Sequence, residues 1–97
     1  MYQIEITNDA INDLKWLKKT EQTIILNAME KYLIYEPAKE TKNRKPLRQN
    51  DLSSWEIRIG NIRVFYDIDE DENLIIIKAI GRKEHNILFI RGKEFKL

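Results

Sequence analysis

The segment around Gly60 and Asn61 constrains the fold more than any other part of the chain, because it has the pattern of a tight β-hairpin. Apolar and polar residues alternate on both sides of this pair, and such a pair between two alternating runs is typical of a two-residue turn. A turn of this kind sets Arg58 directly opposite Arg63. Facing like charges weaken an antiparallel ladder by roughly 0.2–1 kcal/mol. We therefore interpret the two arginines as a candidate site for an anion such as a phosphate.

The first third of the chain predicts one strand followed by two helices. Residues Tyr2 to Thr7 alternate apolar and polar side chains, which indicates a half-buried strand. Asn8 is placed to cap a first helix, and Thr20 is placed to cap a second helix that ends before Pro37. The second helix carries apolar residues at the spacing of one buried face. We expect the two helices to form a helical hairpin.

The rest of the chain predicts strands joined as a meander. The basic connector from Ala38 to Leu52 lacks periodicity. The run Leu74–Ile80 is nearly all apolar, which predicts a central strand that Gly81 ends, and Ile87–Ile90 is interpreted as a short helix. The predicted fold class is α+β: an N-terminal strand, a two-helix hairpin and a three-stranded antiparallel meander. We expect both helices to pack on one face of a three- or four-stranded sheet.

Length and composition exclude several kinds of protein. With 97 residues, 42% of them hydrophobic, we expect a single domain spanning residues 1–97. The absence of cysteine excludes a disulfide framework and a thiolate metal site, and it is compatible with a reducing compartment, so we expect the cytoplasm. No apolar run approaches the roughly 20 residues of a membrane span. No glycine fingerprint or metal-ligand spacing occurs either, so we expect no cofactor and no metal.

The net charge of +1 conceals two blocks of opposite sign. Acidic residues crowd positions 67–72, which is typical of an exposed hairpin turn. Basic residues crowd the connector and recur after the central strand, where they would attract a nucleic-acid backbone. Aromatic rings among them could stack on unpaired bases. The predicted RNA-binding residues are Lys42, Arg44, Lys45, Arg48, Arg82 and Phe89, with Phe65 as a further stacking ring.

Each of these features has a simpler interpretation. Arg58 could pair with Glu56, two residues away on the same face of its strand. Phe65 could be buried under the tail, and His85 could be an ordinary surface residue. The charged blocks could be solvated loops. Only the combination of these features favours a nucleic-acid interface.

Three motifs make the chain resemble a known superfamily. They are Lys45-Pro-Leu-Arg48, the run Gly60-Asn-Ile-Arg63-Val-Phe-Tyr66, and Ala79-Ile-Gly81 followed by Arg82-Lys83-Glu84-His85. Together with the predicted order of elements, they resemble the RelE/ParE superfamily of toxins from bacterial and archaeal toxin-antitoxin systems. The resemblance spans nearly the full length, and its most specific part is the Gly-x-x-Arg-Val-x-Tyr signature.

The resemblance implies an activity. RelE-like members are metal-free ribonucleases that cut mRNA in the ribosomal decoding site, where basic side chains and a tyrosine help the ribose 2′-hydroxyl attack the adjacent phosphate. On that pattern Arg63 matches the arginine that stabilises the phosphate, Arg58 falls at a neighbouring basic position, and Lys83 matches a second arginine. The chain departs from the pattern at Glu56, where a lysine is expected, and at Phe89, where the tyrosine is expected.

The second departure leaves a proton-transfer role unfilled. The reaction needs one group to remove a proton and one to return it, and a phenyl ring exchanges none. Histidine exchanges protons readily near neutral pH, and His85 lies four residues before Phe89. We therefore predict a catalytic set of Arg58, Arg63, Lys83 and His85.

Two alternatives to a ribonuclease stay open. ParE-like members of the superfamily inhibit DNA gyrase, and for them the missing tyrosine would have no importance. A chain could also keep the scaffold without activity and serve only to bind an antitoxin or RNA. In each case the resemblance implies a cognate antitoxin that folds as it wraps the toxin. The helical hairpin, with Trp16 and Tyr35 at its margins, offers apolar surface for that partner.

Overall fold

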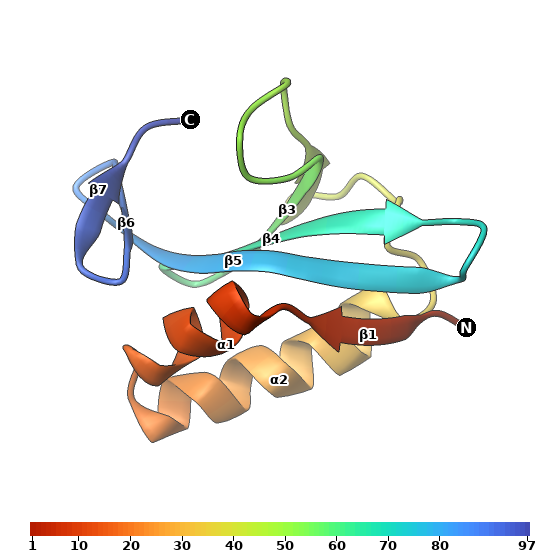
Figure 1. Cartoon of the computed structure of the whole chain (residues 1–97), viewed down its shortest axis with the longest axis horizontal. Coiled ribbons are helices and arrows are strands. Elements are labelled where there is room, and N and C mark those ends of the chain that lie inside the picture. Colours follow the sequence, from red (N-terminus) through yellow and green to blue (C-terminus); the bar gives the residue numbers. More distant parts are fainter.

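The computed structural model describes all 97 residues, and two helices lie together on one side of a curved sheet (Figure 1). The predicted α+β fold is therefore confirmed. The elements are β1 (Gln3–Ile6), α1 (Asn8–Lys15), α2 (Lys19–Leu33), β2 (Arg44–Pro46), β3 (Trp55–Ile59), β4 (Ile62–Asp69), β5 (Leu74–Glu84), β6 (Ile87–Ile90) and β7 (Lys93–Phe95).

The sheet has seven strands. Six of them follow the order β2-β3-β4-β5-β6-β7, with each neighbouring pair antiparallel, and the seventh, β1, pairs with β5 in parallel. The long strand β5 organises this arrangement. One edge of β5 pairs with β4 along most of its length, so β1 and β6 share the other edge. Strand β1 pairs with the beginning of β5, and β6 pairs with its end.

Helix α1 fills the space that β1 leaves along β5. The Thr7 hydroxyl accepts a hydrogen bond from the Ala10 N–H (3.2 Å) and donates one to the Ile77 carbonyl (2.8 Å), so one residue caps the helix and ties it to the strand. The buried Asp13 carboxylate accepts from the Ile80 N–H (2.9 Å) and from Arg91. Burial raises the pKa of Asp13.

The face of the sheet that contacts the helices, here called the helix face, carries the larger core. Ile25, Met29 and Leu33 of α2 are almost fully buried against Val64 and other sheet residues. At one end of this core the Tyr66 hydroxyl donates to the carbonyl of Pro37 (2.7 Å), which fixes the segment after α2. The other sheet residues of this core are Ile57, Ile62, Tyr66, Ile75, Ile77 and Ile80.

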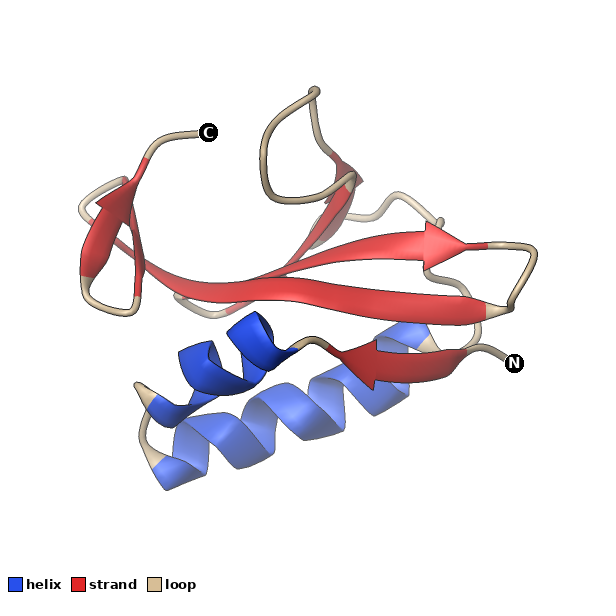
Figure 2. Cartoon of the chain, in the orientation of Figure 1, coloured by secondary structure: helices blue, strands red, loops and turns tan.

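The opposite face, here called the far face, carries a smaller apolar cluster. Phe65 and Ala79 lie at its centre, and Phe95 of β7 packs against them from one side. The loop 47–54 and the β6–β7 hairpin rise from this face at separate places (Figure 2). The remaining members are Leu47, Leu52, Leu88 and Ile90. Much of the sheet between these two projections is left without a covering helix.

The structure corrects several predicted details. The tail forms the hairpin β6–β7 and not a helix at Ile87–Ile90, because two positive-φ turns fold it back on β5. Strand β5 continues through Gly81 to Glu84. The connector contains the strand β2, and the sheet is therefore larger than expected. Thr7 caps α1 in place of Asn8.

The start of α2 also differs, because the helix begins at Lys19 and not after Thr20. The Glu21 carboxylate accepts a hydrogen bond from the backbone N–H of Lys18 (3.1 Å), which supports a start two residues earlier than a threonine cap would give. Neither helix is long and apolar enough to cross a membrane.

Candidate functional site

The hairpin between β3 and β4 has the predicted geometry. Gly60 adopts a φ of 60°, and the register pairs Ile59 with Ile62 and Arg58 with Arg63. The two-residue turn therefore places two arginines opposite each other on neighbouring strands. Because side chains alternate along a strand, both arginines point to the far face, away from Ile57 and the helices.

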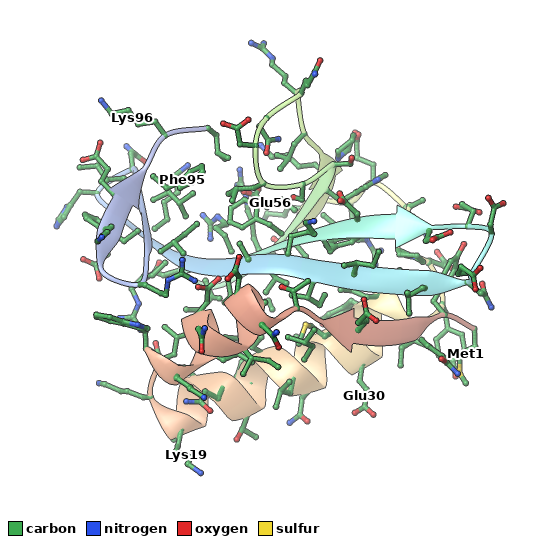
Figure 3. All side chains as sticks on the ribbon, viewed as in Figure 1. Met1, Lys19, Glu30, Glu56, Phe95 and Lys96 are labelled. Atoms are coloured by element: carbon green, nitrogen blue, oxygen red, sulfur yellow. The ribbon has the colours of Figure 1, made fainter.

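The same alternation brings further polar residues to the far face. Lys45 of β2 is the cross-strand partner of Glu56, and Glu56 lies two residues before Arg58 on β3. On β5, Arg82 contacts helix α2, so its neighbour Lys83 points to the far face. Figure 3 labels Glu56 on the side of the sheet away from the helices. These far-face residues, here called the far-face cluster, are Lys45, Glu56, Arg58, Arg63 and Lys83.

The Arg63 guanidinium is only partly satisfied by the protein. Its Nη1 donates to the backbone carbonyls of Gly60 (2.8 Å) and Ile62 (3.1 Å), which draws the side chain toward the turn. Its Nε is buried and has no hydrogen-bond partner. Burial lowers the pKa of Arg63, the charge of Arg58 acts in the same direction, and Glu56 opposes them. Arg63 has no ion-pair partner in the protein, so an anion that reached the rest of its guanidinium would offset the cost of burying the charge.

Arg58 and Glu56 form an ion pair across one face of β3. The Arg58 Nε lies 3.5 Å from the Glu56 Oε2, so the simpler interpretation of Arg58 as a partner of Glu56 is confirmed. The Arg58 side chain nevertheless keeps 40% of its surface exposed, whereas Glu56 keeps 8%. A loose contact of this length leaves most of the guanidinium donors of Arg58 available to a ligand.

Lys83 and His85 lie near the end of β5, beyond the two arginines. The backbone N–H of Lys83 donates to the Asn61 carbonyl (2.8 Å), which ties this end of β5 to the hairpin turn. Neither Lys83 nor Lys45 pairs with a carboxylate. His85 is exposed and, with Asn86, forms the two-residue turn to β6, where both residues have positive φ. Its predicted role in proton transfer stays a prediction.

Three of the predicted RNA-binding residues lie on the helix face, away from the far-face cluster. Arg44 is buried, and its guanidinium donates to the carbonyls of Tyr32 and Lys39. Arg82 forms an ion pair with Glu21 of α2. Phe89 is the cross-strand partner of Arg82 and lines a cleft with it beside Trp16.

The structure therefore places these three side chains where they cannot share a ligand with Arg63. Phe65, the second predicted stacking ring, is fully buried, so no base can stack on it. Lys42 and Arg48 are exposed in the segments on either side of β2. Both remain available to a nucleic-acid backbone.

Comparisons with known proteins identify the family. Residues 4–87 match the family described as the ParE toxin of type II toxin-antitoxin system, parDE. The chain belongs to this toxin family. Its predicted membership of the RelE/ParE superfamily is thereby confirmed, and the chain is a toxin of a type II toxin-antitoxin system. No curated protein matches the chain in sequence.

Solved structures of toxin-antitoxin complexes share the fold. The RelBE2 complex from Mycobacterium tuberculosis has a chain with a TM-score of 0.73 and 24% sequence identity, covering 84% of the toxin and 98% of that chain. The archaeal RelE-RelB complex from Pyrococcus horikoshii OT3 gives a TM-score of 0.65 and 23% identity, covering 81% of the toxin and 91% of that chain. These likenesses show the arrangement of helices and strands.

Sequence reasoning did not include Glu56 in the site. The sequence presents Glu56 only as a possible partner for Arg58 and as a departure from the family pattern. Its position two residues before Arg58 on an alternating strand was the signal that could have placed it in the site. Nowhere in the toxin do three or more histidine, cysteine or acidic side chains gather in a way that could hold a metal ion.

Proposed function

We propose that the toxin is an endoribonuclease that cuts mRNA in the ribosomal decoding site, by attack of a ribose 2′-hydroxyl on the adjacent phosphate. The observation that carries this proposal is the pair of arginines placed opposite each other by the register of β3 and β4, one of which, Arg63, has a buried Nε with no hydrogen-bond partner. Guanidinium groups bind phosphate oxygens through paired hydrogen bonds, so two arginines at neighbouring positions of the sheet suit a phosphodiester ligand.

The proposed chemistry depends on charge placed before the reaction begins. As the 2′-oxygen attacks, negative charge accumulates on the phosphate oxygens, and Arg58 and Arg63 are held where they would stabilise it. Removing one such donor from an enzyme commonly costs about 10²–10³-fold in rate. Arg63 matches the phosphate-stabilising arginine of RelE-like toxins, and its partly buried position is consistent with that role.

Exposed cations around the site would hold the rest of the strand. Lys45 belongs to the far-face cluster, and Lys42 and Arg48 flank it in sequence. Each contact with a phosphate releases counterions, so binding should weaken steeply as salt rises. We propose that these three residues position the mRNA, whereas Arg44 serves the fold.

A cleavage assay on translating ribosomes tests the proposal. The toxin, separated from its antitoxin, is incubated with ribosomes that carry a defined mRNA, and the RNA ends are mapped. We expect products with a 2′,3′-cyclic phosphate and a 5′-hydroxyl, and no cleavage of an mRNA with a 2′-deoxy nucleotide at the mapped site. Cleavage of the 2′-deoxy mRNA at an undiminished rate would contradict the mechanism.

Inhibition of DNA gyrase is the second candidate function. The matched family is described as the ParE toxin of parDE, and Phe89 stands where the ribonucleases have a tyrosine. Gyrase supercoiling assays at the same toxin concentrations distinguish the two functions. Loss of supercoiling together with intact mRNA would favour the gyrase inhibitor.

We propose a cognate antitoxin as the physiological partner, and the similar structures are themselves toxin-antitoxin complexes. Trp16 and Tyr35 keep 65% and 70% of their surface exposed, which is a large apolar area for a partner segment to cover. The product of the gene next to the toxin gene should raise the melting temperature of the toxin. The absence of any shift would count against that product as the partner.

A further inference from the structure

Glu56 is the only carboxylate of the far-face cluster, and its one ion pair is the 3.5 Å contact with Arg58. We propose that Glu56 is the general base that takes the proton from the ribose 2′-hydroxyl. This inference rests on the proposed ribonuclease function and deepens it, because it assigns a proton acceptor that the departure from tyrosine leaves open.

The hydrogen bonds of Glu56 leave one oxygen free for a substrate. Arg58 is the only protein donor to the carboxylate, and it contacts Oε2 at 3.5 Å. No protein group donates to Oε1. Glu56 is 6% exposed as a residue and lies across the ladder from Phe65, so it sits at the edge of an apolar patch. A carboxylate shielded from water, with a free acceptor atom, is suited to hold a hydroxyl group.

The register of the sheet puts Glu56 on one side of the arginine pair. Three cross-strand rows follow one another on the far face. The first contains Glu56, Phe65 and Ala79, and the second contains Arg58, Arg63 and Gly81. Lys83 follows two residues beyond Gly81 on β5. Neighbouring rows on one face are about 7 Å apart, because a strand rises about 3.3 Å per residue.

This order matches the geometry of an in-line displacement. A phosphate between Arg58 and Arg63 would have Glu56 on one side and Lys83 on the other. In such a reaction the attacking 2′-oxygen and the leaving 5′-oxygen lie on opposite sides of the phosphorus, so the base and the acid must also lie on opposite sides. Glu56 is therefore placed for the 2′-hydroxyl, and Lys83 is placed for the 5′-oxygen.

The same geometry separates Glu56 from His85. His85 lies six positions after Ala79, the β5 residue in the row of Glu56, which is about 20 Å along an extended strand. That span is too long for both side chains to act on one phosphate. Lys83 is half-buried and closer to the arginines, so it is the better placed proton donor for this reaction.

The step balances without any further reagent. The Glu56 carboxylate takes the proton of the 2′-hydroxyl while the 2′-oxygen forms a bond to phosphorus. The bond from phosphorus to the 5′-oxygen breaks, and the Lys83 ammonium gives a proton to that oxygen. The products are a 2′,3′-cyclic phosphate and a 5′-hydroxyl, and proton exchange with water restores both side chains.

The test measures single-turnover cleavage of ribosome-bound mRNA by Glu56→Gln, Glu56→Asp and Glu30→Gln toxins. Glutamine keeps the size of the side chain and an acceptor for Arg58 but cannot take a proton at neutral pH. Glu30 is an exposed residue of α2 and provides a control for loss of one negative charge (Figure 3). Circular dichroism and the melting temperature report whether each variant is folded.

We expect Glu56→Gln to cleave about 10²–10⁴-fold more slowly than the wild type, as loss of a general base does, and Glu30→Gln to match the wild type. Glu56→Asp should retain a rate that rises with pH in the acid range, and Glu56→Gln should lose that rise. If Glu56→Gln does not fold, the charge-preserving Glu56→Asp variant still tests the assignment, because moving the carboxylate back by one methylene should slow cleavage.

A substrate with sulfur in place of the leaving 5′-oxygen separates the base from the acid, because a thiolate leaves without a proton. This mRNA should restore the rate of Lys83→Ala but not that of Glu56→Gln. Cleavage by folded Glu56→Gln at the wild-type rate, or its rescue by the sulfur substrate, would overturn the assignment and leave the ribonuclease function intact. A wild-type toxin that cleaves no mRNA would overturn both.

Discussion

Four arginines of the strands β2 to β5 have different environments on the two faces of the sheet. On the helix face, Arg44 donates to two backbone carbonyls and Arg82 pairs with Glu21. On the far face, Arg58 contacts a carboxylate at 3.5 Å, and the Nε of Arg63 has no partner. The guanidinium groups of Arg44 and Arg82 stabilise the fold, whereas those of Arg58 and Arg63 still have hydrogen-bond donors for a ligand.

This difference arises from the alternation of side chains along a strand. A shift of one residue moves a side chain from one face to the other, so neighbours in a basic run do not act together. Arg44 and Lys45 are adjacent in sequence, as are Arg82 and Lys83, yet each pair is divided between the faces. Arg44 and Arg82 therefore lie on the helix face, and Lys45 and Lys83 lie on the far face.

Replacing one arginine on each face by alanine gives the largest expected difference in mRNA cleavage. Arg63→Ala should reduce mRNA cleavage about 10²–10³-fold, because a donor to the developing charge is lost. Arg82→Ala should lower the melting temperature but keep cleavage per folded molecule close to that of the wild type. The measurement is single-turnover cleavage corrected for the folded fraction. Equal losses of activity in the two variants would contradict the assignment of ligand binding to the far face and of stability to the helix face.

The buried arginine on the helix face should matter for stability alone. Arg44→Ala leaves the carbonyls of Tyr32 and Lys39 without their donor, so it should reduce the free energy of unfolding by about 1.5–3 kcal/mol. Lys45→Ala is the matched control, because Lys45 is exposed and should change stability by less than about 0.5 kcal/mol. Urea unfolding followed by circular dichroism measures both. An Arg44→Ala toxin as stable as the control would contradict the structural role.

Gly81 of β5 lies so close to β6 that it leaves no room for a side chain. A Cβ at this position would lie 2.7 Å from the Phe89 carbonyl oxygen and 2.9 Å from the Leu88 Cδ1. Gly81→Ala should therefore destabilise the toxin by about 1–3 kcal/mol through overpacking. Amide hydrogen exchange should show the loss first in β6 and β7. Unchanged exchange there would mean that β6 can move aside at no cost.

The smallest expected effect concerns the ion pair of Arg82 on the helix face. The hydrogen bond from the Lys18 backbone and, to a lesser degree, Arg82 lower the pKa of Glu21 in the folded toxin. The ionised Glu21 therefore contributes its full stabilisation above the pKa it has in the unfolded chain, and this stabilisation is lost as pH falls through the folded pKa. Glu21→Gln should be less stable than the wild type at pH 7 by no more than about 1 kcal/mol, as for a partly exposed pair. The difference should shrink near pH 3 in urea unfolding. A difference that grows with acidity would contradict this sign.

The parts of the fold with strong local signals were predictable from sequence. The alternating runs around Gly60 and Asn61 determined the register of the hairpin, because the turn chemistry and the apolar face agree. The apolar stripe of α2 also predicted its buried face. The tail was missed because its four apolar residues, Ile87–Ile90, are too few to distinguish a strand from a helix by periodicity.

The site was only partly predictable, for a different physical reason. The pairing of Arg58 with Arg63 followed from the hairpin alone. The fate of Arg44 did not, because a three-residue strand within an aperiodic connector decides which face it occupies, and contacts 5 and 12 residues away hold its guanidinium. Glu56 does not stand out in the sequence, because a carboxylate among cations is most simply their ion-pair partner.

The most direct test of this account is the behaviour of the four guanidinium groups when RNA binds. A dinucleotide with a 2′-O-methyl group cannot be cleaved, and it can be titrated into labelled toxin while the arginine Nε–H resonances are followed by NMR. The account predicts that the resonances of Arg58 and Arg63 shift together, whereas those of Arg44 and Arg82 stay in place. Shifts confined to Arg44 and Arg82, with Arg63 unchanged, would contradict it.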